Sequence, residues 1–378
     1  MKNIAILVPT LNKGGAERVA ANMSLEFAKH YNVYLIVHDG SNIIYPYGGQ
    51  LIDLHLPPAK NKIGKITTLY KRIRALRKLK SQYKIDVTIS HLPPSNYVNI
   101  FSRTGDRIFT YIHSMEAWSP GRAVREWLTA RMSDKMICVS ECVRRNMIDT
   151  FHVDADKALT VYNFCDLKCP NVNKRTSSAI TISTMGRLTE PKGQWHLIRA
   201  LKKVIEYSET PILLKIIGDG ELHYSLVQLA EKMGVQDNII FAGFLDDPWS
   251  ALADTDIYVS SSLWEGLPMA LIEAGRCGLP IISTDCDAGC REILAPETDI
   301  VHKTSYIEKA EYGVLIPVCQ AGDIEQTDLT SEESIMADAI IEMIKNPELR
   351  YEYGKRAKAR SDNFRAINIM KKWEDILE

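Results

Sequence analysis

The stretch Ile212-Leu-Leu-Lys-Ile-Ile217 is an almost continuous apolar run, and Pro280-Ile-Ile-Ser283 repeats the pattern farther along the chain. Such runs are typical of parallel strands that are covered on both faces. Working outward from them, we predict further strands over residues 3–8, 33–37, 85–90, 107–112, 135–139, 158–162, 179–185, 238–242, 256–260 and 313–316. Helical periodicity lies between them, for example over 192–206, 221–233 and 331–345. This alternation predicts an α/β protein with right-handed crossovers.

The alternating pattern occurs twice, on either side of a polar segment at residues 166–178. A chain of 378 residues also exceeds the usual size of one hydrophobic core. We therefore predict two Rossmann-like parallel-sheet domains that face each other across a cleft, with ligands beyond the carboxyl ends of the strands. The expected boundaries are 1–170 for the first domain and 171–363 for the second. An amphipathic helix over 364–378 is expected to pack back on the first domain.

Composition indicates an ordinary globular protein, with 46% apolar and 25% charged residues. No stretch has the roughly 18–20 uninterrupted apolar residues of a membrane span. The first apolar run, residues 4–8, is too short for a signal peptide, so we expect a cytoplasmic protein. The eight cysteines lack the spacing of a zinc site, and scattered reduced thiols are the expectation.

The net charge of −1 hides an asymmetry between the two halves of the chain. Residues 1–170 hold 24 Lys and Arg against 14 Asp and Glu, whereas residues 171–378 hold 22 against 33. A basic first half favours a partner that is anionic.

Two carboxylates bracket the segment Glu265-Gly-Leu-Pro-Met-Ala-Leu-Ile-Glu273, which follows an expected strand. Pro268 suits the first turn of a helix, so Glu265 should lie in the loop and Glu273 within the helix. The free amides of Gly266, Leu267 and Met269 would form an anion site at the helix start. A capped helix with one solvent-exposed glutamate explains the same spacing equally well.

Two cations follow the strand expected over 179–185, in the segment Gly186-Arg187-Leu-Thr-Glu-Pro-Lys192-Gly193. An Arg can bind phosphate oxygens through two N–H groups, and a Lys can add a mobile point charge. A departing nucleoside diphosphate needs such charge neutralisation. Taken alone, the same residues also fit a solvated surface loop.

Together these segments resemble the retaining glycosyltransferases of family 4, which have the GT-B fold. The family's Glu-x7-Glu signature matches Glu265 and Glu273, and its Gly-Arg-x4-Lys-Gly segment matches residues 186–193. Further matches cover essentially the whole chain in order, namely Gly14-Gly-Ala-Glu-Arg-Val19, Gly218-Asp-Gly220, Phe241-Ala-Gly-Phe244, Cys277-Gly-Leu-Pro-Ile-Ile-Ser-Thr-Asp285, Gly289 and Glu292.

The resemblance implies a role for each matching position. Glu265 and His113 would contact the donor sugar as catalytic residues, and Glu273 would hold the ribose of the nucleotide. The donor diphosphate would be bound by Arg187, Lys192, Gly15, Gly266, Leu267, Pro268 and Met269. Gly14 would lie on the acceptor side. A strand-end histidine without a ligand is the plainer interpretation of His113.

The family usually needs no bound metal or other cofactor, and we expect none here. Two Asp-x-Asp triplets, Asp254/Asp256 and Asp285/Asp287, are better explained as turn and loop residues. Where many members carry Gly-Gly, this chain has Ala288-Gly289. This form of the segment, with Ala-Gly in place of Gly-Gly, looks most like family members that use UDP-linked hexoses or N-acetylhexosamines. Other members use GDP-linked sugars.

Residues 60–84 contain ten Lys or Arg and no acid. Ile66, Leu69, Ile73, Leu76, Leu79 and Tyr83 recur at helical spacing, which predicts a core-facing apolar side on a Rossmann helix. Ten unpaired charges exceed what a solvated face requires, so we hypothesise docking on the anionic inner membrane leaflet. Trp118 and Arg122 could line the acceptor path at that interface. No nucleic-acid motif accompanies the charges, so nucleic acid is not expected.

The sequence therefore predicts a retaining glycosyltransferase that moves a hexose or N-acetylhexosamine from a nucleoside diphosphate sugar, UDP-linked in the leading interpretation. The acceptor would be a lipid-linked saccharide, a polysaccharide or a lipopolysaccharide. Rival interpretations are a nucleotide-sugar epimerase of the same fold and a non-catalytic nucleotide-sugar-binding module. The absence of a Gly-x-Gly-x-x-Gly fingerprint after the first strand disfavours an NAD oxidoreductase.

Overall fold

The structure is a computed structural model that describes residues 1–115, 117, 119–167 and 179–378. It divides into two compact units, each described here by itself. The first unit comprises Met1–Asn163 together with Met370–Glu378, and the second comprises Phe164–Ile369. The domain boundary expected between residues 170 and 171 lies in the segment 168–178, outside the described residues.

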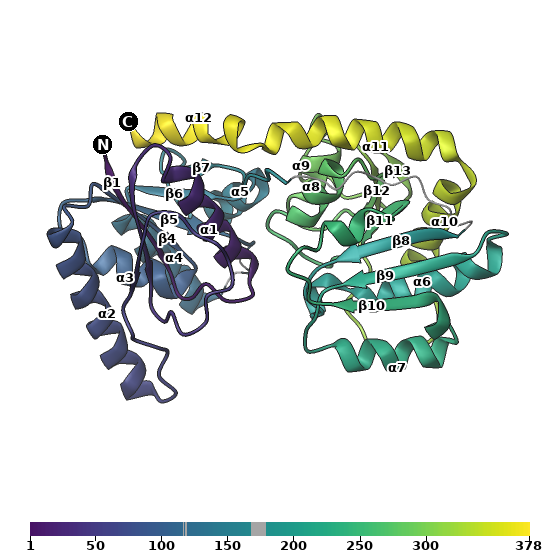
Figure 1. Ribbon diagram of the computed structural model, residues 1–378, viewed down its shortest axis with the longest axis horizontal. Helices are drawn as coiled ribbons and strands as arrows, with labels where there is room; N and C mark the ends of the chain where they lie inside the picture. Colours follow the sequence, from purple (N-terminus) through teal and green to yellow (C-terminus); the bar gives the residue numbers. More distant parts are fainter. Residues whose placement is uncertain (116, 118, 168–178) are drawn as a thin grey trace. The chain divides into compact units, whose positions relative to one another are not determined.

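The first unit contains a seven-stranded parallel sheet in the order β3-β2-β1-β4-β5-β6-β7. Figure 1 shows this sheet and the helices that connect its strands. The strands are β1 (Asn3–Val8), β2 (Asn32–Val37), β3 (Gln50–Asp53), β4 (Val87–His91), β5 (Arg107–Ile112), β6 (Lys135–Cys138) and β7 (Ala158–Thr160). The helices are α1 (Gly15–Phe27), α2 (Lys62–Gln82), α3 (Pro93–Phe101), α4 (Pro120–Met132) and α5 (Glu141–Phe151).

The centre of this sheet is buried on both faces, which explains the unbroken apolar run of β1. Residues 4–8 are completely enclosed. The last helix, α12 (Ala366–Leu377), supplies Trp373 to the same unit. Its indole ring contacts the ring of Phe27 edge-on, with centroids 5.4 Å apart. Aromatic pairs in this geometry stabilise a core beyond the area that they bury, so the chain terminus forms part of the first unit's core.

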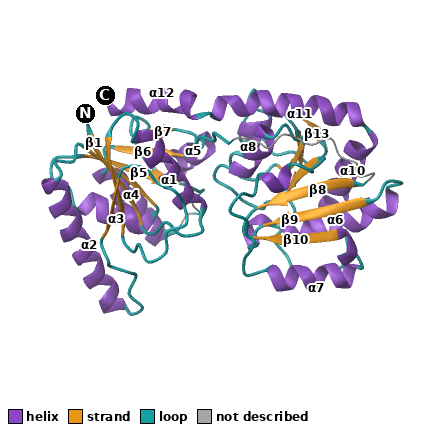
Figure 2. Ribbon diagram, in the orientation of Figure 1, coloured by secondary structure: helices purple, strands orange, loops and turns teal. Residues whose placement is uncertain are grey.

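The second unit repeats the architecture with the order β10-β9-β8-β11-β12-β14-β13 (Figure 2). The strands are β8 (Ile180–Met185), β9 (Ile212–Ile217), β10 (Ile239–Gly243), β11 (Ile257–Ser260), β12 (Ile281–Thr284), β13 (Glu308–Lys309) and β14 (Val314–Ile316). The helices are α6 (Gln194–Tyr207), α7 (His223–Met233), α8 (Met269–Arg276), α9 (Cys290–Leu294), α10 (Ser331–Lys345) and α11 (Pro347–Ser361). Short 3-10 turns lie at Glu190–Lys192, Gln236–Asn238, Ser250–Leu252 and Asp362–Phe364.

Two strands of the structure were not predicted from the sequence. β3 is a four-residue strand beside β2 at one sheet edge, and β13 has two residues that pair antiparallel with β14. Short edge strands carry polar residues and lack a continuous apolar run, because only one neighbour covers them. The prediction of two parallel α/β sheets is confirmed, with the addition that β13 makes the second sheet mixed at its edge.

None of the helices in the described part of the chain is long and apolar enough to cross a membrane.

Candidate functional site

The two signature glutamates lie in the loop that joins β11 to α8 and in α8 itself. Glu265 lies in this loop, and Glu273 is in the middle of α8 with only 3% of its surface exposed. Its burial excludes the alternative of one solvent-exposed glutamate. The helix begins at Met269, so Pro268 occupies the N-cap rather than the predicted first turn, and no side-chain hydrogen bond caps this end. The first amides of α8 have no acceptor within the helix.

Lys192 and Glu265 form an ion pair, although 73 residues separate them. Lys192 Nζ lies 2.5 Å from Glu265 Oε1, and the side chains are 26% and 12% exposed. Ser262 Oγ donates a second hydrogen bond to the same carboxylate oxygen at 2.8 Å. Burial disfavours the charge on Lys192, but attraction and hydrogen bonding from Glu265 outweigh it and raise the lysine pKa. The sequence predicted both residues at strand ends, but not their contact.

Backbone contacts hold Lys192 against the β11 loop. It closes the 3-10 turn Glu190–Lys192, and its carbonyl accepts a hydrogen bond from Ser261 Oγ at 3.1 Å. Gly193 follows with a φ of 55°, and a side chain there would approach the Ser261 carbonyl oxygen to 2.5 Å. Only glycine fits this left-handed, close-packed position, which accounts for the Lys-Gly pair in the sequence.

Arg187 lies on the loop after β8, and its side chain is exposed. Gln194, at the start of α6, donates from Nε2 to the Arg187 carbonyl oxygen at 3.1 Å. This bond fixes the backbone of the loop and leaves the guanidinium at the surface of the second unit. Arg187 and Lys192 therefore emerge from the same short connection between β8 and α6.

The backbone at the start of α8 packs closely against Gly289, which has a φ of 80°. A side chain there would come within 2.5 Å of Pro268 Cδ. Arg291, in α9, forms ion pairs with Asp285 at 2.6 Å and Glu308 at 2.7 Å, which fix the loop between β12 and α9. Gly289, which the resemblance singled out, thus packs closely against the backbone at the start of α8, where we predicted an anion site.

The Asp-x-Asp triplets make structural contacts. Asp254 pairs with Lys215 at 2.5 Å, and Asp256 accepts a hydrogen bond from the Thr181 amide at 2.8 Å. Asp285 is the partner of Arg291. These bonds account for three of the four aspartates without a ligand, and the expectation that the reaction needs no metal stays a prediction.

Tyr258 was missed by the sequence analysis. It lies on β11, is 1% exposed, and its hydroxyl is 3.2 Å from the Met185 amide at the end of β8. Burial raises the pKa of this hydroxyl, and the charges of Glu273 and Glu265 add to the effect. Tyr258 therefore links β11 to the end of β8, from which Arg187 and Lys192 follow. A buried tyrosine in an apolar strand carries no sequence signal for this function.

The first unit holds the remaining predicted residues. Gly14 is the N-cap of α1, and the space around Gly15 is open, since a side chain added there would meet nothing within 4 Å. His113 follows β5, and its Nε2 lies 3.0 Å from Nδ1 of His91, at the end of β4. Because the carboxyl ends of parallel strands share one sheet edge, these positions belong to the ligand-binding edge of a Rossmann-like unit.

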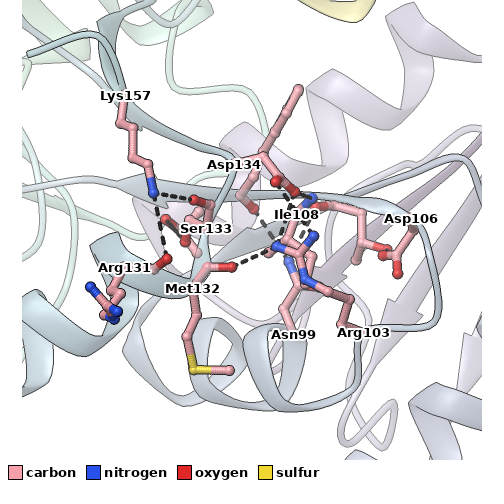
Figure 3. Close-up of polar contacts among 12 residues, drawn as sticks. Asn99, Arg103, Asp106, Ile108, Arg131, Met132, Ser133, Asp134 and Lys157 are labelled. Carbon is pink, nitrogen blue, oxygen red and sulfur yellow. Dashed lines mark hydrogen bonds and ion pairs between the residues drawn. The ribbon is translucent and has the colours of Figure 1, made fainter. Parts of the chain in front are cut away.

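Arg122 lies in the first turn of α4, and its Nη1 donates to the Ala117 carbonyl at 3.0 Å. Trp118, the other acceptor-side residue that we predicted, lies outside the described residues. The far end of α4 is held by two cations (Figure 3). Lys157 donates to the Ser133 carbonyl at 3.2 Å, and Arg103 donates to the Met132 carbonyl at 2.6 Å. Cations at a helix C-terminus complement its dipole and free carbonyls.

The basic helix α2 differs from its prediction in two respects. The ten Lys and Arg of residues 60–84 are not all unpaired. Lys80 forms a buried ion pair with Asp106 at 2.8 Å, and Arg72 donates a hydrogen bond to the Leu56 carbonyl. Its apolar side also begins later than expected, since Ile66 is 71% exposed whereas the later apolar positions pack inward. Apolar and basic groups therefore share the exposed face of its first half.

The two halves of the chain match two family models. Residues 13–168 match Glycosyltransferase Family 4, and residues 170–316 match Glycosyl transferases group 1. A Campylobacter jejuni N-acetylgalactosaminyltransferase that acts on a diphospho-undecaprenol acceptor is 24% identical over 98% of this chain and 97% of its own length. An uncharacterized glycosyltransferase of Methanocaldococcus jannaschii is 40% identical over 51% of this chain, and the alignment spans 48% of that relative.

Among solved structures, HepE of Anabaena in complex with UDP superposes with a TM-score of 0.73 at 17% identity. The match covers 100% of this chain and 99% of that chain. At this identity the likeness concerns the fold, and it bears out the prediction of a GT-B fold with two Rossmann-like domains.

Proposed function

Because this chain belongs to glycosyltransferase family 4 and has the GT-B fold, we propose that it transfers a hexose or N-acetylhexosamine from a UDP-linked donor with retention of configuration. The acceptor in this proposal is a lipid-linked saccharide or a polysaccharide or lipopolysaccharide chain. The choice of acceptor is supported by the C. jejuni relative, which acts on a diphospho-undecaprenol saccharide. The UDP donor is supported by the ligand of HepE.

The contact between Lys192 and Glu265 is the observation that carries the proposal. It joins a cation suited to a diphosphate with a carboxylate suited to a sugar, beside the free amides at the start of α8. Glu273, a little over one turn into α8, is the partner for the ribose hydroxyls. Arg187 adds a second cation to the diphosphate from the surface loop.

In the proposed reaction the acceptor hydroxyl attacks the anomeric carbon on the face from which the diphosphate departs. The bond from the sugar to the diphosphate breaks, and a phosphate oxygen of the leaving group takes the acceptor proton. Lys192, Arg187 and the helix amides stabilise the charge on the leaving diphosphate. Glu265 stabilises the positive charge on the sugar ring. This route requires no separate protein base and no metal.

The test uses the full chain with UDP- and GDP-sugars, first by thermal shift and then with a synthetic polyprenyl-diphosphate saccharide as acceptor. Transfer from a UDP-sugar with an α-linked product from an α-linked donor supports the proposal. Inversion would contradict the mechanism. Conversion of the donor sugar without an acceptor would instead favour the epimerase. Tight binding without turnover on lipid-linked or polysaccharide acceptors would favour the non-catalytic module.

We further propose that α2 docks the first unit on an anionic membrane leaflet. Its exposed apolar groups are Ile63, Ile66 and Tyr70, which are 77%, 71% and 63% exposed. Exposed lysines at positions 62, 65 and 71 flank them, as expected for a helix that lies in a lipid interface. The N-terminal half of α2 is the lower, dark-blue segment in Figure 1.

Flotation with phosphatidylglycerol vesicles tests this docking. Replacing Lys62, Lys65 and Lys71 by Gln removes about 3 kcal/mol of attraction, or roughly 100-fold in partitioning. A matched control removes three exposed lysines of the second unit, Lys202, Lys345 and Lys355. Equal vesicle binding by both triple variants, or no binding by the original chain, would refute the docking surface.

A further inference from the structure

His91 and His113 form a pair at the ligand-binding edge of the first sheet. In the parallel pairing of β4 with β5, His91 lies opposite Tyr111, two residues before His113. The ring of Tyr111 stacks on both imidazoles, with centroids 4.8 Å from each. The distance from His91 Nδ1 to His113 Nε2 is 3.0 Å. The stack and the hydrogen bond together fix both rings.

The hydrogen bond joins two neutral rings. Burial lowers the pKa of His113 to about 3. Burial also lowers the pKa of His91 well below its usual value, and repulsion from His113 adds to this effect. A neutral imidazole carries one proton, on one of its two nitrogens. One ring of the pair must therefore donate to the other, and this choice decides which nitrogen of His113 carries its proton.

The surroundings of His91 decide which ring donates. His91 is completely enclosed, and its Nε2 has no hydrogen-bond partner among the described residues. If His113 donated, His91 would carry its own proton on Nε2 as a buried N–H group without an acceptor. Buried donors without a partner are rarer in proteins than buried acceptors without one. Donation from His91 Nδ1 avoids this cost and leaves only a lone pair at Nε2.

We propose that His91 is a positioning residue that donates from Nδ1 to His113 Nε2 and thereby keeps the proton of His113 on Nδ1. His113, which is largely buried but keeps part of its surface exposed, then offers an N–H donor to a hydroxyl or phosphate oxygen of the reactants and does not serve as a proton acceptor. The role of His113 rests on the proposed function, whereas the tautomer rests on the geometry alone.

The tautomer can be measured without substrate. Long-range ¹H–¹⁵N correlation of the full chain labelled with ¹⁵N-histidine distinguishes the Nδ1–H from the Nε2–H form, and His113→Asn assigns the signal. We expect the Nδ1–H pattern for His113 at neutral pH. An Nε2–H pattern in the unmodified chain would overturn the proposal. This measurement stands even if no donor or acceptor is turned over, so its failure and a failure of the proposed function are separable.

Two isosteric variants then test the consequence for transfer. In His91→Asn the side-chain amide can still donate to His113 Nε2, whereas in His91→Asp the carboxylate can only accept, which forces the proton of His113 onto Nε2. We expect His91→Asn to retain the Nδ1–H pattern and kcat within about threefold. His91→Asp should lose the pattern and about 100-fold in kcat, with KM for the nucleotide sugar unchanged within about twofold. Thermal melting checks the fold of both variants.

Similar kcat values for the two folded variants would overturn the positioning role. Full transfer activity of His113→Asn would overturn the proposal that the Nδ1–H form of His113 acts in transfer, even if the unmodified chain showed the expected NMR pattern. If both His91 variants failed to fold, the spectrum of the unmodified chain and the activity of His113→Asn would still decide the proposal.

Discussion

Glu265→Gln tests separately the two roles proposed for the ion pair, which are stabilisation of the charged sugar by Glu265 and binding of the diphosphate by Lys192. The substitution keeps the shape of the side chain and an oxygen that can accept the hydrogen bond from Ser262 Oγ, now 2.8 Å away. It removes the negative charge that lies 2.5 Å from Lys192 Nζ. We therefore expect turnover to fall and the affinity for UDP to rise, because Lys192 no longer divides its charge between Glu265 and the diphosphate.

The magnitudes follow from the contacts. A hydrogen bond to a charged group contributes about 1.5–3 kcal/mol, and solvent screening of the partly exposed Lys192, 26% exposed, reduces its contribution. A gain of about 1 kcal/mol corresponds to roughly fivefold tighter UDP binding. Loss of the carboxylate that stabilises the charged sugar should lower kcat about 100-fold, as removal of a single preorganised transition-state contact commonly does.

Calorimetric titration with UDP and initial rates of transfer measure these two effects. Ser262→Ala is the matched control, because it removes a hydrogen bond that an uncharged donor makes to the same oxygen and leaves both charges. It should change kcat by less than about tenfold and leave UDP affinity unaltered. Full transfer by Glu265→Gln would refute the assignment of the carboxylate to the sugar. UDP binding that is tenfold weaker would refute the competition for Lys192.

Three further predictions concern separate parts of the molecule. Arg187→Ala should weaken UDP binding by about 10- to 100-fold, measured by calorimetry, without lowering the melting temperature, because the side chain is exposed; unchanged affinity would remove Arg187 from the diphosphate site. Gly15→Ala should leave folding intact, because its surroundings are open, yet slow transfer if a diphosphate approaches this backbone; an unaltered rate would contradict that placement. The free energy of unfolding should fall as pH drops from 6.5 toward 3, because burial lowers the pKa of His38 to about 3 and the unfolded chain therefore binds a proton that the folded chain excludes. His38→Asn should reduce the slope of unfolding free energy against pH by about 1.4 kcal/mol per pH unit, measured by urea titrations. An identical slope in the variant would refute this.

Much of the fold could be predicted because buried parallel strands leave a strong sequence pattern. The run Ile212–Ile217 is β9 in full, and the expected helix 331–345 is α10 to the residue. β3 could not be predicted, because its four residues gain their structure from pairing with β2. The exposed position of Ile66 was also hidden, since helical spacing alone does not reveal where a helix extends beyond the sheet that it covers.

The candidate site divides in the same way. Strand ends and a helix start are local features, so the sequence indicated where Glu265 and Lys192 would lie. Their contact depends on the order of strands in the sheet, which places β8 beside β11. The pair His91 and His113 depends likewise on β4 lying beside β5. Side chains that become neighbours through strand order leave no spacing that a single sequence can show.

The ion pair also connects the two halves of the proposed reaction. Lys192 pairs with Glu265, so this largely buried carboxylate does not lack a partner of opposite charge. In the proposed reaction, the bound diphosphate competes for Lys192 and thereby exposes the charge of Glu265 to the sugar. As the diphosphate leaves, positive charge grows on the ring while negative charge grows on the phosphate. Glu265 then faces a positive charge that develops only in the transition state, and Lys192 faces a negative charge that is larger there than in the bound donor. Contacts that strengthen in the transition state are those whose binding energy lowers a barrier.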